Sequence, residues 1–302
     1  VTLHVMGEPT LHRDFFQILS HARQKNVNIG LTTNGRSLGS LTGKELLDYP
    51  LHQIDVSLQT PDESSFAMRR AKGISFETYL AGILEFFFSY RKRHPETIFK
   101  FRFLNTRFRK KEMEKKTGTM DVISSTPELR RVFTFWADRL LSGLGIEVDE
   151  KEKVMAGIQK LVSYKWNVVE IQPNLFFETY VLDDWGHAFD ETPVREAWGG
   201  FCFGMRDHFA VLYNGDLVLC CIDYEGKTAV GNLHEASLEQ ILSSDRVKEI
   251  VKGFDRFALV HPHCRHCLGS TGALSWAIKP ILSVMGLKVL KPYLYSKIRL
   301  FS

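Results

Sequence analysis

The segment "HQIDVSLQT", residues 52–60, decides the fold class of the first part of this chain. Apolar and polar residues alternate along it. The apolar positions are Ile54, Val56 and Leu58, and the polar positions are Asp55, Ser57 and Gln59. Because successive side chains of a strand point to opposite faces, this period of two predicts a β-strand with one face in the core.

Similar segments lie on both sides of it along the chain. The strand-like segments are "TLHVM" (2–6), "VNIGLTTNG" (27–35), "IFKFRFLNT" (98–106) and "NVVEIQP" (167–173). Helix-like segments lie between them: one from Phe15 with Asp14 as N-cap, one over 41–50 that ends at Pro50, and others over 76–94, 129–142 and 150–164. The early strands recur about every 25 residues, which is typical of βα units in a parallel sheet or barrel.

The chain changes character near residue 185, where turn residues become frequent and after which all five cysteines follow. Residues 208–221, "HFAVLYNGDLVLCC", predict a β-hairpin around an Asn-Gly-Asp turn. Residues 237–254 predict a helix with Ser237 as its N-cap. We therefore expect a βα domain over 1–185, a small α+β domain over 186–270 and a basic amphipathic tail over 271–302.

Two basic stretches have more than one interpretation. Residues 107–128 lack periodicity, and we interpret them as an insertion with a solvated charged face rather than as a substrate or nucleic-acid patch. The tail contains Pro280 and Pro292, which are expected to interrupt it. We expect the tail to pack on its own domain, with contact to a membrane surface as the alternative.

Composition excludes several classes of protein. The 302 residues are 44% apolar and 25% charged, an ordinary globular balance. The formal net charge of +4 is too small to indicate a nucleic-acid partner by itself. There is neither a run of about 18 apolar residues nor a signal-peptide pattern, so we expect a cytoplasmic protein without a membrane span.

The cysteines form the clearest chemical pattern. Four of them, from three segments of the chain, are suitably spaced to surround one site: Cys202, Cys220, Cys264 and Cys267. The C-x-x-C pair offers two thiolates from one tight loop, and zinc or a [4Fe–4S] cluster would each accept four thiolates. A metal site is favoured over a disulfide framework, because this chain is neither small nor dense in cysteine.

The fifth cysteine and three nearby histidines leave alternatives open. Cys221 follows Cys220 directly, and neighbours on a strand point to opposite faces, so we expect Cys220 to be the ligand and Cys221 a spare thiol. A mixed Cys/His zinc site would instead use His261, His263 or His266. The alternative is that these histidines lie on the surface around a loop.

Several of these motifs resemble those of a known family. "MGEP" (6–9), "GLTTNG" (30–35) and "VSLQT" (56–60) look like the ends of barrel strands in the radical S-adenosylmethionine (SAM) superfamily. The C-terminal pattern is similar to the SPASM/Twitch auxiliary-cluster domains of that superfamily. It consists of Cys202, "NGDLVLC" (214–220), "VGNLHEASLEQIL" (230–242) and "CRHC" (264–267).

The resemblance implies a fold, two cofactors and a set of binding residues. The implied fold is a partial parallel (βα)6-type barrel that lacks its first βα unit and is followed by the small auxiliary-cluster domain. In the family, a [4Fe–4S] cluster with S-adenosylmethionine generates a 5′-deoxyadenosyl radical. The implied contacts to S-adenosylmethionine or substrate are Gly7 and Glu8 for the methionine amino group, with Ser57, Thr33 and Asn105 around them. No catalytic residue is assigned.

Two departures from the family pattern limit the resemblance. Met6 replaces the first glycine of the usual pair, and the CxxxCxxC motif that holds the radical-generating cluster is absent from these 302 residues. We expect the chain to be an N-terminally truncated fragment that is inactive alone. Ligation by Cys202, Cys220, Cys264 and Cys267 implies a single auxiliary [4Fe–4S] cluster.

The leading functional hypothesis is a radical S-adenosylmethionine oxidoreductase, or an enzyme that modifies a peptide or small molecule. The family implies an electron donor such as flavodoxin or ferredoxin and gives no reason to expect nucleic acid. The alternative is a non-catalytic zinc or iron–sulfur module, or a degenerate partner protein, that uses the barrel as a scaffold.

Overall fold

The computed structural model describes residues 1–5, 7–59, 61–68, 73–106, 123–163, 166–182, 186–187, 193–220 and 222–290. The chain divides into two compact units, Val1–Asp183 and Asp184–Ser302. Most of the basic stretch 107–128 and the end of the tail lie outside the described residues. No helix among the described residues is both long enough and apolar enough to cross a membrane.

The first unit is an α/β unit built on one six-stranded sheet with the order β1-β2-β3-β4-β6-β5. Its strands are β1 (Thr2–Leu3), β2 (Gly30–Thr33), β3 (Gln53–Leu58), β4 (Ile98–Thr106), β5 (Val168–Gln172) and β6 (Leu175–Leu182). Its helices are η1 (Pro9–Leu11), α1 (Phe15–Gln24), α2 (Leu41–Leu46), α3 (Glu63–Met68), α4 (Phe76–Arg93), α6 (Thr126–Gly143) and α7 (Val148–Ile158). The predicted α/β class with a mostly parallel sheet is confirmed.

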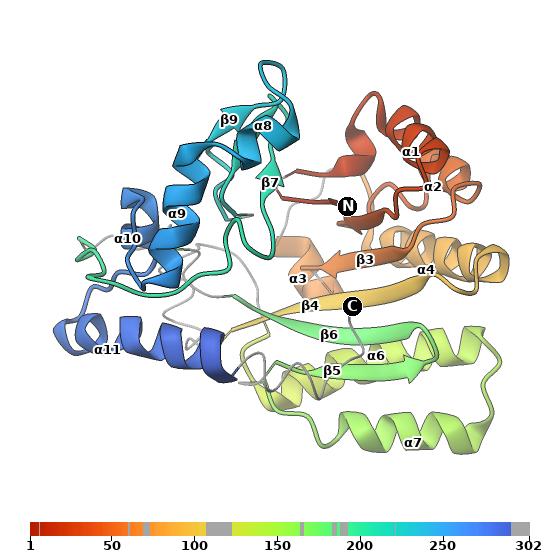
Figure 1. Ribbon diagram of the computed structural model, residues 1–302. Helices are drawn as coiled ribbons and strands as arrows, with labels where there is room; N and C mark the ends of the chain where they lie inside the picture. Colours follow the sequence, from red (N-terminus) through yellow and green to blue (C-terminus); the bar gives the residue numbers. More distant parts are fainter. Residues whose placement is uncertain are drawn as a thin grey trace. The chain divides into compact units, whose positions relative to one another are not determined.

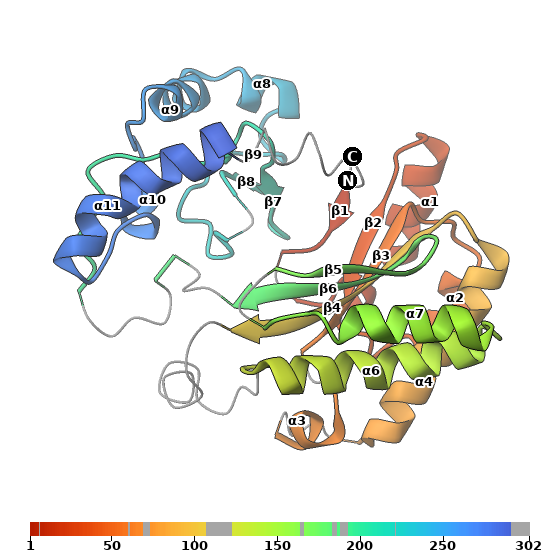
Figure 2. The same ribbon diagram turned by 90° about the horizontal axis from the view of Figure 1, so that it is seen from below.

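One side of this sheet forms the hydrophobic core with α4 and α6, which lie along it in Figure 2. The alternate residues Phe99, Phe101 and Phe103 of β4 are fully buried on that side. Phe101 lies 5.7 Å from the Trp136 ring of α6, and Phe99 lies 5.0 Å from the Phe87 ring of α4. Serine N-caps, such as Ser75 before α4, define the starts of several helices.

The end of the sheet differs from the sequence expectation. Only one strand was predicted there, over 167–173, whereas the structure has the antiparallel pair β5 and β6. Asn174, with φ of 61°, makes the turn between them. β6 then lies parallel beside β4, so the antiparallel edge strand β5 makes the sheet mixed rather than wholly parallel.

Other predicted boundaries in the first unit are shorter in the structure. The strand predicted over 2–6 is limited to Thr2–Leu3, because Val5 and Gly7 adopt φ values of 91° and 89° that a strand does not allow. Asp14 precedes α1 as predicted but makes no capping hydrogen bond. The helix predicted over 150–164 is α7, which ends at Ile158.

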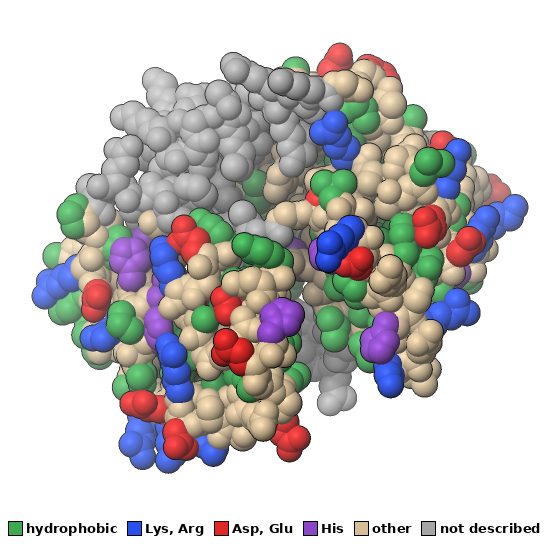
Figure 3. Space-filling model, turned by 90° about the horizontal axis from the view of Figure 1, so that it is seen from above, with side chains coloured by type: hydrophobic (Ala, Val, Ile, Leu, Met, Phe, Trp, Pro, Cys, Tyr) green, Lys and Arg blue, Asp and Glu red, His purple; other side chains and the backbone are tan. Residues whose placement is uncertain are grey.

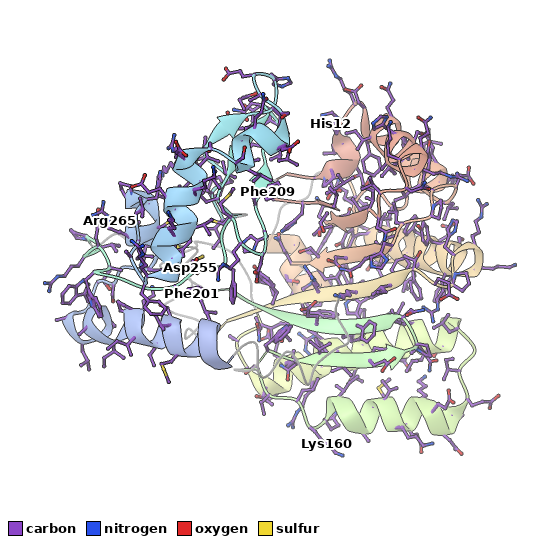
Figure 4. All side chains as sticks on the ribbon, viewed as in Figure 1. His12, Lys160, Phe201, Phe209, Asp255 and Arg265 are labelled. Carbon is purple, nitrogen blue, oxygen red and sulfur yellow. The ribbon has the colours of Figure 1, made fainter. Side chains whose placement is uncertain are left out.

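The second unit contains a small antiparallel sheet and a group of helices (Figure 1). The strands are β7 (Ala210–Val211), β8 (Asp216–Val218) and β9 (Gly231–Asn232), and β7 and β8 form the predicted hairpin. The helices are α8 (Leu238–Leu242), α9 (Asp245–Asp255), α10 (Pro262–Cys267), α11 (Ala273–Ser283) and the π-helical segment η2 (Val284–Leu290). Phe201, labelled in Figure 4, is 1% exposed in the core of this unit with Phe254.

Three predictions for the second unit need correction. The helix predicted over 237–254 is two helices, since Ser237 caps α8 and Ser244 starts α9 with a second N-cap. The segment containing "CRHC" is the short helix α10 rather than a loop. Pro280 does not interrupt the tail but lies inside α11.

The face drawn in Figure 3 carries Lys and Arg side chains interspersed with Asp and Glu among the described residues. The small positive net charge is therefore not gathered into one patch on that face.

Candidate functional site

The carboxyl ends of parallel strands β1 to β4 form one edge of the first unit's sheet. All five predicted cofactor contacts lie at this edge: Gly7 and Glu8 after β1, Thr33 on β2, Ser57 on β3 and Asn105 on β4. Ligands of open α/β sheets bind outside the carboxyl ends of the strands. The topology therefore brings the predicted residues to the edge where a ligand is expected.

Glu8 is half-buried and its carboxylate is held by three donors. Oε1 accepts from the Thr10 hydroxyl at 2.7 Å and from the Thr10 backbone N–H at 3.3 Å. Oε2 accepts from the backbone N–H of Asn34 at 2.6 Å. The Thr10 hydroxyl also bonds to the Ser37 hydroxyl at 2.6 Å, so Glu8 is part of a network that joins the ends of β1 and β2.

Gly7 and Thr33 lie beside Glu8 in different environments. Gly7 is exposed, has φ of 89°, and no heavy atom would lie within 4 Å of a Cβ added there. Glycine is therefore favoured at this position by the positive φ, and not by a neighbouring atom that would exclude a side chain. Thr33 is 1% exposed, and its hydroxyl accepts from the Gly35 N–H at 3.1 Å, so this hydroxyl serves the turn after β2.

Ser57 and Asn105 also differ in accessibility. Ser57 is half-buried near the end of β3, opposite Arg102 in the β3–β4 register. Asn105 is fully buried, and its amide donates to the carbonyl of Ser163 at 2.6 Å. Of the five predicted contacts, Gly7, Glu8 and Ser57 remain reachable from solvent, whereas Thr33 and Asn105 are buried.

A row of charged residues crosses the sheet on the face opposite the aromatic core. Nη2 of Arg102 lies 3.2 Å from Asp55, and its Nε lies 3.1 Å from Glu178. Gln53 donates to Asp55 at 2.8 Å, and the Trp166 indole donates to Glu178 at 3.0 Å. Three neighbouring strands, β3, β4 and β6, therefore share one buried ion-pair network.

The sequence interpretation missed this row, although a signal was present. In "IFKFRFLNT" the cations alternate with phenylalanines, which places Lys100 and Arg102 on the face opposite the core. Burial raises the pKa of Asp55, although Arg102 and Lys100 oppose the rise. Burial also lowers the pKa of Lys100, against the attraction of Asp55 and Glu178. Such burial of charges is common at functional sites.

In the second unit, the four predicted metal ligands Cys202, Cys220, Cys264 and Cys267 are all half-buried. Burial, together with the nearby Cys202, Cys220 and Cys267, raises the pKa of Cys264 to about 12. Three segments of the chain thus bring their cysteines around Cys264. Cys221 lies outside the described residues.

The surroundings of these thiols suit a group with sulfur ligands. Cys264 and Cys267 share the single short helix α10, and a Cβ at Gly186 would lie 3.1 Å from the Cys267 sulfur. No three described His, Cys, Asp or Glu side chains converge at the distances of one bound ion. The cysteines are therefore neighbours rather than a closed coordination shell, and their donor chemistry fits an iron–sulfur cluster or zinc.

The histidines near α10 have local partners. His261 is the N-cap of α10 and accepts from the His263 N–H at 3.2 Å. The His266 ring lies 5.9 Å from the ring of His187, a residue that the sequence interpretation missed. Burial is the main cause that lowers the pKa values of His261 and His266.

Two family models match the chain. The model of the Radical SAM superfamily matches residues 1–87, and the SPASM model, an iron–sulfur cluster-binding domain, matches residues 202–268. The second match includes the four cysteines from Cys202 to Cys267.

Two curated relatives match parts of the chain. The probable GTP 3′,8-cyclase of Pyrococcus abyssi (strain GE5 / Orsay) is 37% identical over 62 residues, which are 20% of this chain and 20% of the relative. The Fe-coproporphyrin III synthase of Methanosarcina barkeri (strain Fusaro / DSM 804) is 31% identical over 83 residues, 28% of this chain and 21% of the relative. The matched segment thus spans only 20% or 21% of the length of each relative.

Among solved structures, Streptococcus suis SuiB bound to its precursor peptide SuiA matches with a TM-score of 0.43 and 15% identity. That match covers 82% of this chain and 55% of SuiB.

Proposed function

Because a radical SAM superfamily model and an iron–sulfur cluster-binding SPASM model match separate parts of the chain, we propose a specific task for each unit. The first unit binds S-adenosylmethionine at the carboxyl edge of its sheet. The second unit holds one auxiliary [4Fe–4S] cluster through Cys202, Cys220, Cys264 and Cys267. The whole protein is a radical S-adenosylmethionine oxidoreductase or modifying enzyme.

The observation that carries this proposal is the grouping of three cysteines around the half-buried Cys264. Cys202 and Cys220 come from separate loops, while Cys264 and Cys267 come from α10. Four thiolates are the usual ligand set of a [4Fe–4S] cluster. When bound, such a cluster supplies one-electron transfer, while the protein residues set its environment and exclude water.

The first unit offers oxygen atoms for a ligand's ammonium group. Glu8 is half-buried and lies after β1, and its carboxylate retains acceptor capacity beyond its three hydrogen bonds, since an ionised carboxylate has about four lone-pair sites. The backbone next to Gly7 is open, and Ser57 provides a hydroxyl from β3. S-adenosylmethionine supplies the reactive group, so these residues bind and orient it rather than carry out the chemistry.

The substrate and partners belong to the proposal for the whole protein. We propose a peptide or a small molecule as substrate and flavodoxin or ferredoxin as electron donor. The 302 residues contain no CxxxCxxC motif, so the radical-generating cluster is not assigned to residues of this chain.

The cluster assignment is tested by anaerobic reconstitution with iron and sulfide, followed by electron paramagnetic resonance of the dithionite-reduced protein. We expect the signal of a reduced [4Fe–4S] cluster. A protein that binds zinc but no iron or sulfide would contradict the assignment and support the zinc alternative.

The cofactor contact is tested by calorimetric titration of the chain with S-adenosylmethionine. We expect Ser57→Ala to weaken binding by about 2- to 10-fold, the value of one hydrogen bond. Ser64→Ala is the matched control, since Ser64 is exposed on α3 and its hydroxyl donates to Asp62 at 3.0 Å. Equal affinities of the two variants would contradict the role of Ser57.

A further inference from the structure

A buried carboxylate lies in the loop that follows Cys220. Asp223 is 2% exposed, and both oxygens of its carboxylate accept hydrogen bonds from residues of that loop. Oδ2 accepts from the backbone N–H and from the hydroxyl of Thr228, both at 2.6 Å. Oδ1 accepts from the N–H of Lys227 at 3.0 Å. The loop therefore closes on itself through one side chain.

Thr228 connects Asp223 to Leu219, the residue that precedes the proposed ligand Cys220. It is fully buried, and its hydroxyl accepts from the backbone N–H of Leu219 at 3.0 Å while donating to Asp223. The N–H of Asp223 in turn donates to the carbonyl of Cys220 at 3.3 Å. The backbone on both sides of the Cys220 side chain is thus held by the same pair of residues.

The same network reaches the loop of a second proposed ligand. The carbonyl of Leu219 accepts from the N–H of Met205 at 3.1 Å. Met205 follows Cys202 by three residues, and the intervening Gly204 donates its N–H to the Cys202 sulfur at 3.5 Å. A continuous series of hydrogen bonds therefore connects Asp223 with the loops that carry Cys220 and Cys202.

We propose that Asp223 and Thr228, which we call the Asp223–Thr228 clasp, are positioning residues for the auxiliary cluster. They hold the Cys220 loop at a fixed place relative to the Cys202 loop, so that the two thiolates are arranged before the cluster assembles. This inference rests on the proposed cluster in the second unit. Residues that orient metal ligands without touching the metal commonly change metal affinity by about 10- to 100-fold.

The clasp also places a fixed negative charge beside the cluster site. Asp223 accepts three hydrogen bonds, as an ionised carboxylate does, and its backbone N–H donates to the carbonyl of the proposed ligand Cys220 at 3.3 Å. A negative charge near a cluster disfavours the addition of an electron, because reduction makes the cluster more negative. The clasp therefore holds the reduction potential low as well as fixing the loop.

Three variants separate the effect of the clasp on the position of the Cys220 loop from its effect on the reduction potential. Thr228→Val removes the hydroxyl and keeps the shape, whereas Thr228→Ser keeps the hydroxyl. Asp223→Asn keeps the size but removes the charge and replaces one acceptor with a donor. Thr179→Val is the matched control, since Thr179 is also fully buried and accepts from a backbone N–H, that of Asn167 at 2.7 Å, but lies in the first unit.

The experiment measures two properties of the reconstituted chain: the rate at which a chelator removes iron, and the midpoint potential in a redox titration followed by electron paramagnetic resonance. We expect about 10- to 100-fold faster iron loss for Thr228→Val, recovery with Thr228→Ser, and no change for Thr179→Val. Asp223→Asn is expected to move the potential to a more positive value. Circular dichroism confirms that each variant is folded.

Two negative results have different meanings. A wild-type chain that takes up no iron contradicts the proposed cluster, and the clasp's role with it. A wild-type chain that holds a cluster, with unchanged iron loss in Thr228→Val and an unchanged potential in Asp223→Asn, contradicts only the role of the clasp.

Discussion

The carboxylate of Glu8 accepts a hydrogen bond from the backbone N–H of Asn34, with 2.6 Å between Oε2 and the nitrogen. This contact joins the chain after β1 to the chain after β2. The residue that the family resemblance assigns to the cofactor's amino group therefore also braces the edge of the sheet. Both roles use the same carboxylate, so stability and cofactor binding are expected to be linked at this position.

Because the Glu8–Asn34 hydrogen bond joins two segments at the edge of the sheet, we predict that Glu8→Gln lowers the free energy of unfolding by about 1–3 kcal/mol. The amide would direct a donor at one of the N–H or O–H donors that Glu8 now accepts from, and a buried donor would lose its partner. Urea denaturation measures the change, with Glu45→Gln on an exposed part of α2 as the control. Equal stability of the two variants would show that the contact is not structural.

The ion-pair row predicts that Arg102→Ala destabilises the first unit by about 3 kcal/mol, because Asp55 and Glu178 would lose their shared cation. The control is Arg93→Ala, whose pair with Asp48 is exposed and should contribute less than about 1 kcal/mol. Chemical denaturation of both variants tests the contrast, which equal losses would contradict.

The same variant has a predicted pH dependence. Burial already raises the folded-state pKa of Asp55, so the native protein loses stability as the pH rises from the unfolded value of 3.8 through the raised value. Without Arg102 the pKa of Asp55 rises further. The stability difference between wild type and Arg102→Ala should therefore be smaller near pH 4 than at pH 7, and a difference independent of pH would contradict this reasoning.

Gly82 of α4 is predicted to resist replacement by alanine. A Cβ on Gly82 would lie 2.8 Å from the Cα of Gly39, a backbone atom that cannot move aside cheaply. Gly82→Ala should therefore destabilise the protein by about 1–3 kcal/mol although alanine favours helices. Gly157→Ala in α7 has no atom within 4 Å of the new Cβ and should be neutral or stabilising. Thermal unfolding compares them, and two shifts of the same sign would refute the packing argument.

The raised pKa of Cys264, about 12, predicts slow alkylation of this thiol in the reduced, metal-free protein. The thiolate is the reactive form, so modification by iodoacetamide should stay slow at pH 8 and accelerate as the pH rises toward that value. Mass spectrometry of Cys264-containing peptides follows the reaction, with glutathione as a reference thiol. A rate equal to that of glutathione at pH 8 would contradict the buried environment.

The periodic parts of the fold could be predicted from the sequence. β4 over Ile98–Thr106 and α4 over Phe76–Arg93 show strong periods of two and of 3.6 residues, and both were located within one residue. β6 was missed, because the strand predicted over 167–173 was the last one expected in the first domain. Only pairing across the sheet shows that 175–182 returns beside β4.

The candidate sites differ in how much of each could be predicted from the sequence. Cysteine spacing indicated the proposed ligand set, since C-x-x-C and the hairpin cysteine are local patterns. The Asp55–Arg102–Glu178 row depends on the register of three strands, and the Asp223–Thr228 clasp depends on how one loop closes. The alternation in residues 98–106 indicates the face on which Arg102 lies, but neither its pairing with Asp55 and Glu178 nor the closure of the Asp223 loop is contained in a local pattern.

Iron and acid-labile sulfide, counted per chain after anaerobic reconstitution, test the proposed cluster most directly. We predict about four of each for the wild type and for Cys221→Ala, and loss of both in Cys202→Ala and Cys264→Ala. A chain that binds zinc without sulfide, or a Cys264→Ala variant that retains the full iron and sulfide content, would contradict the account.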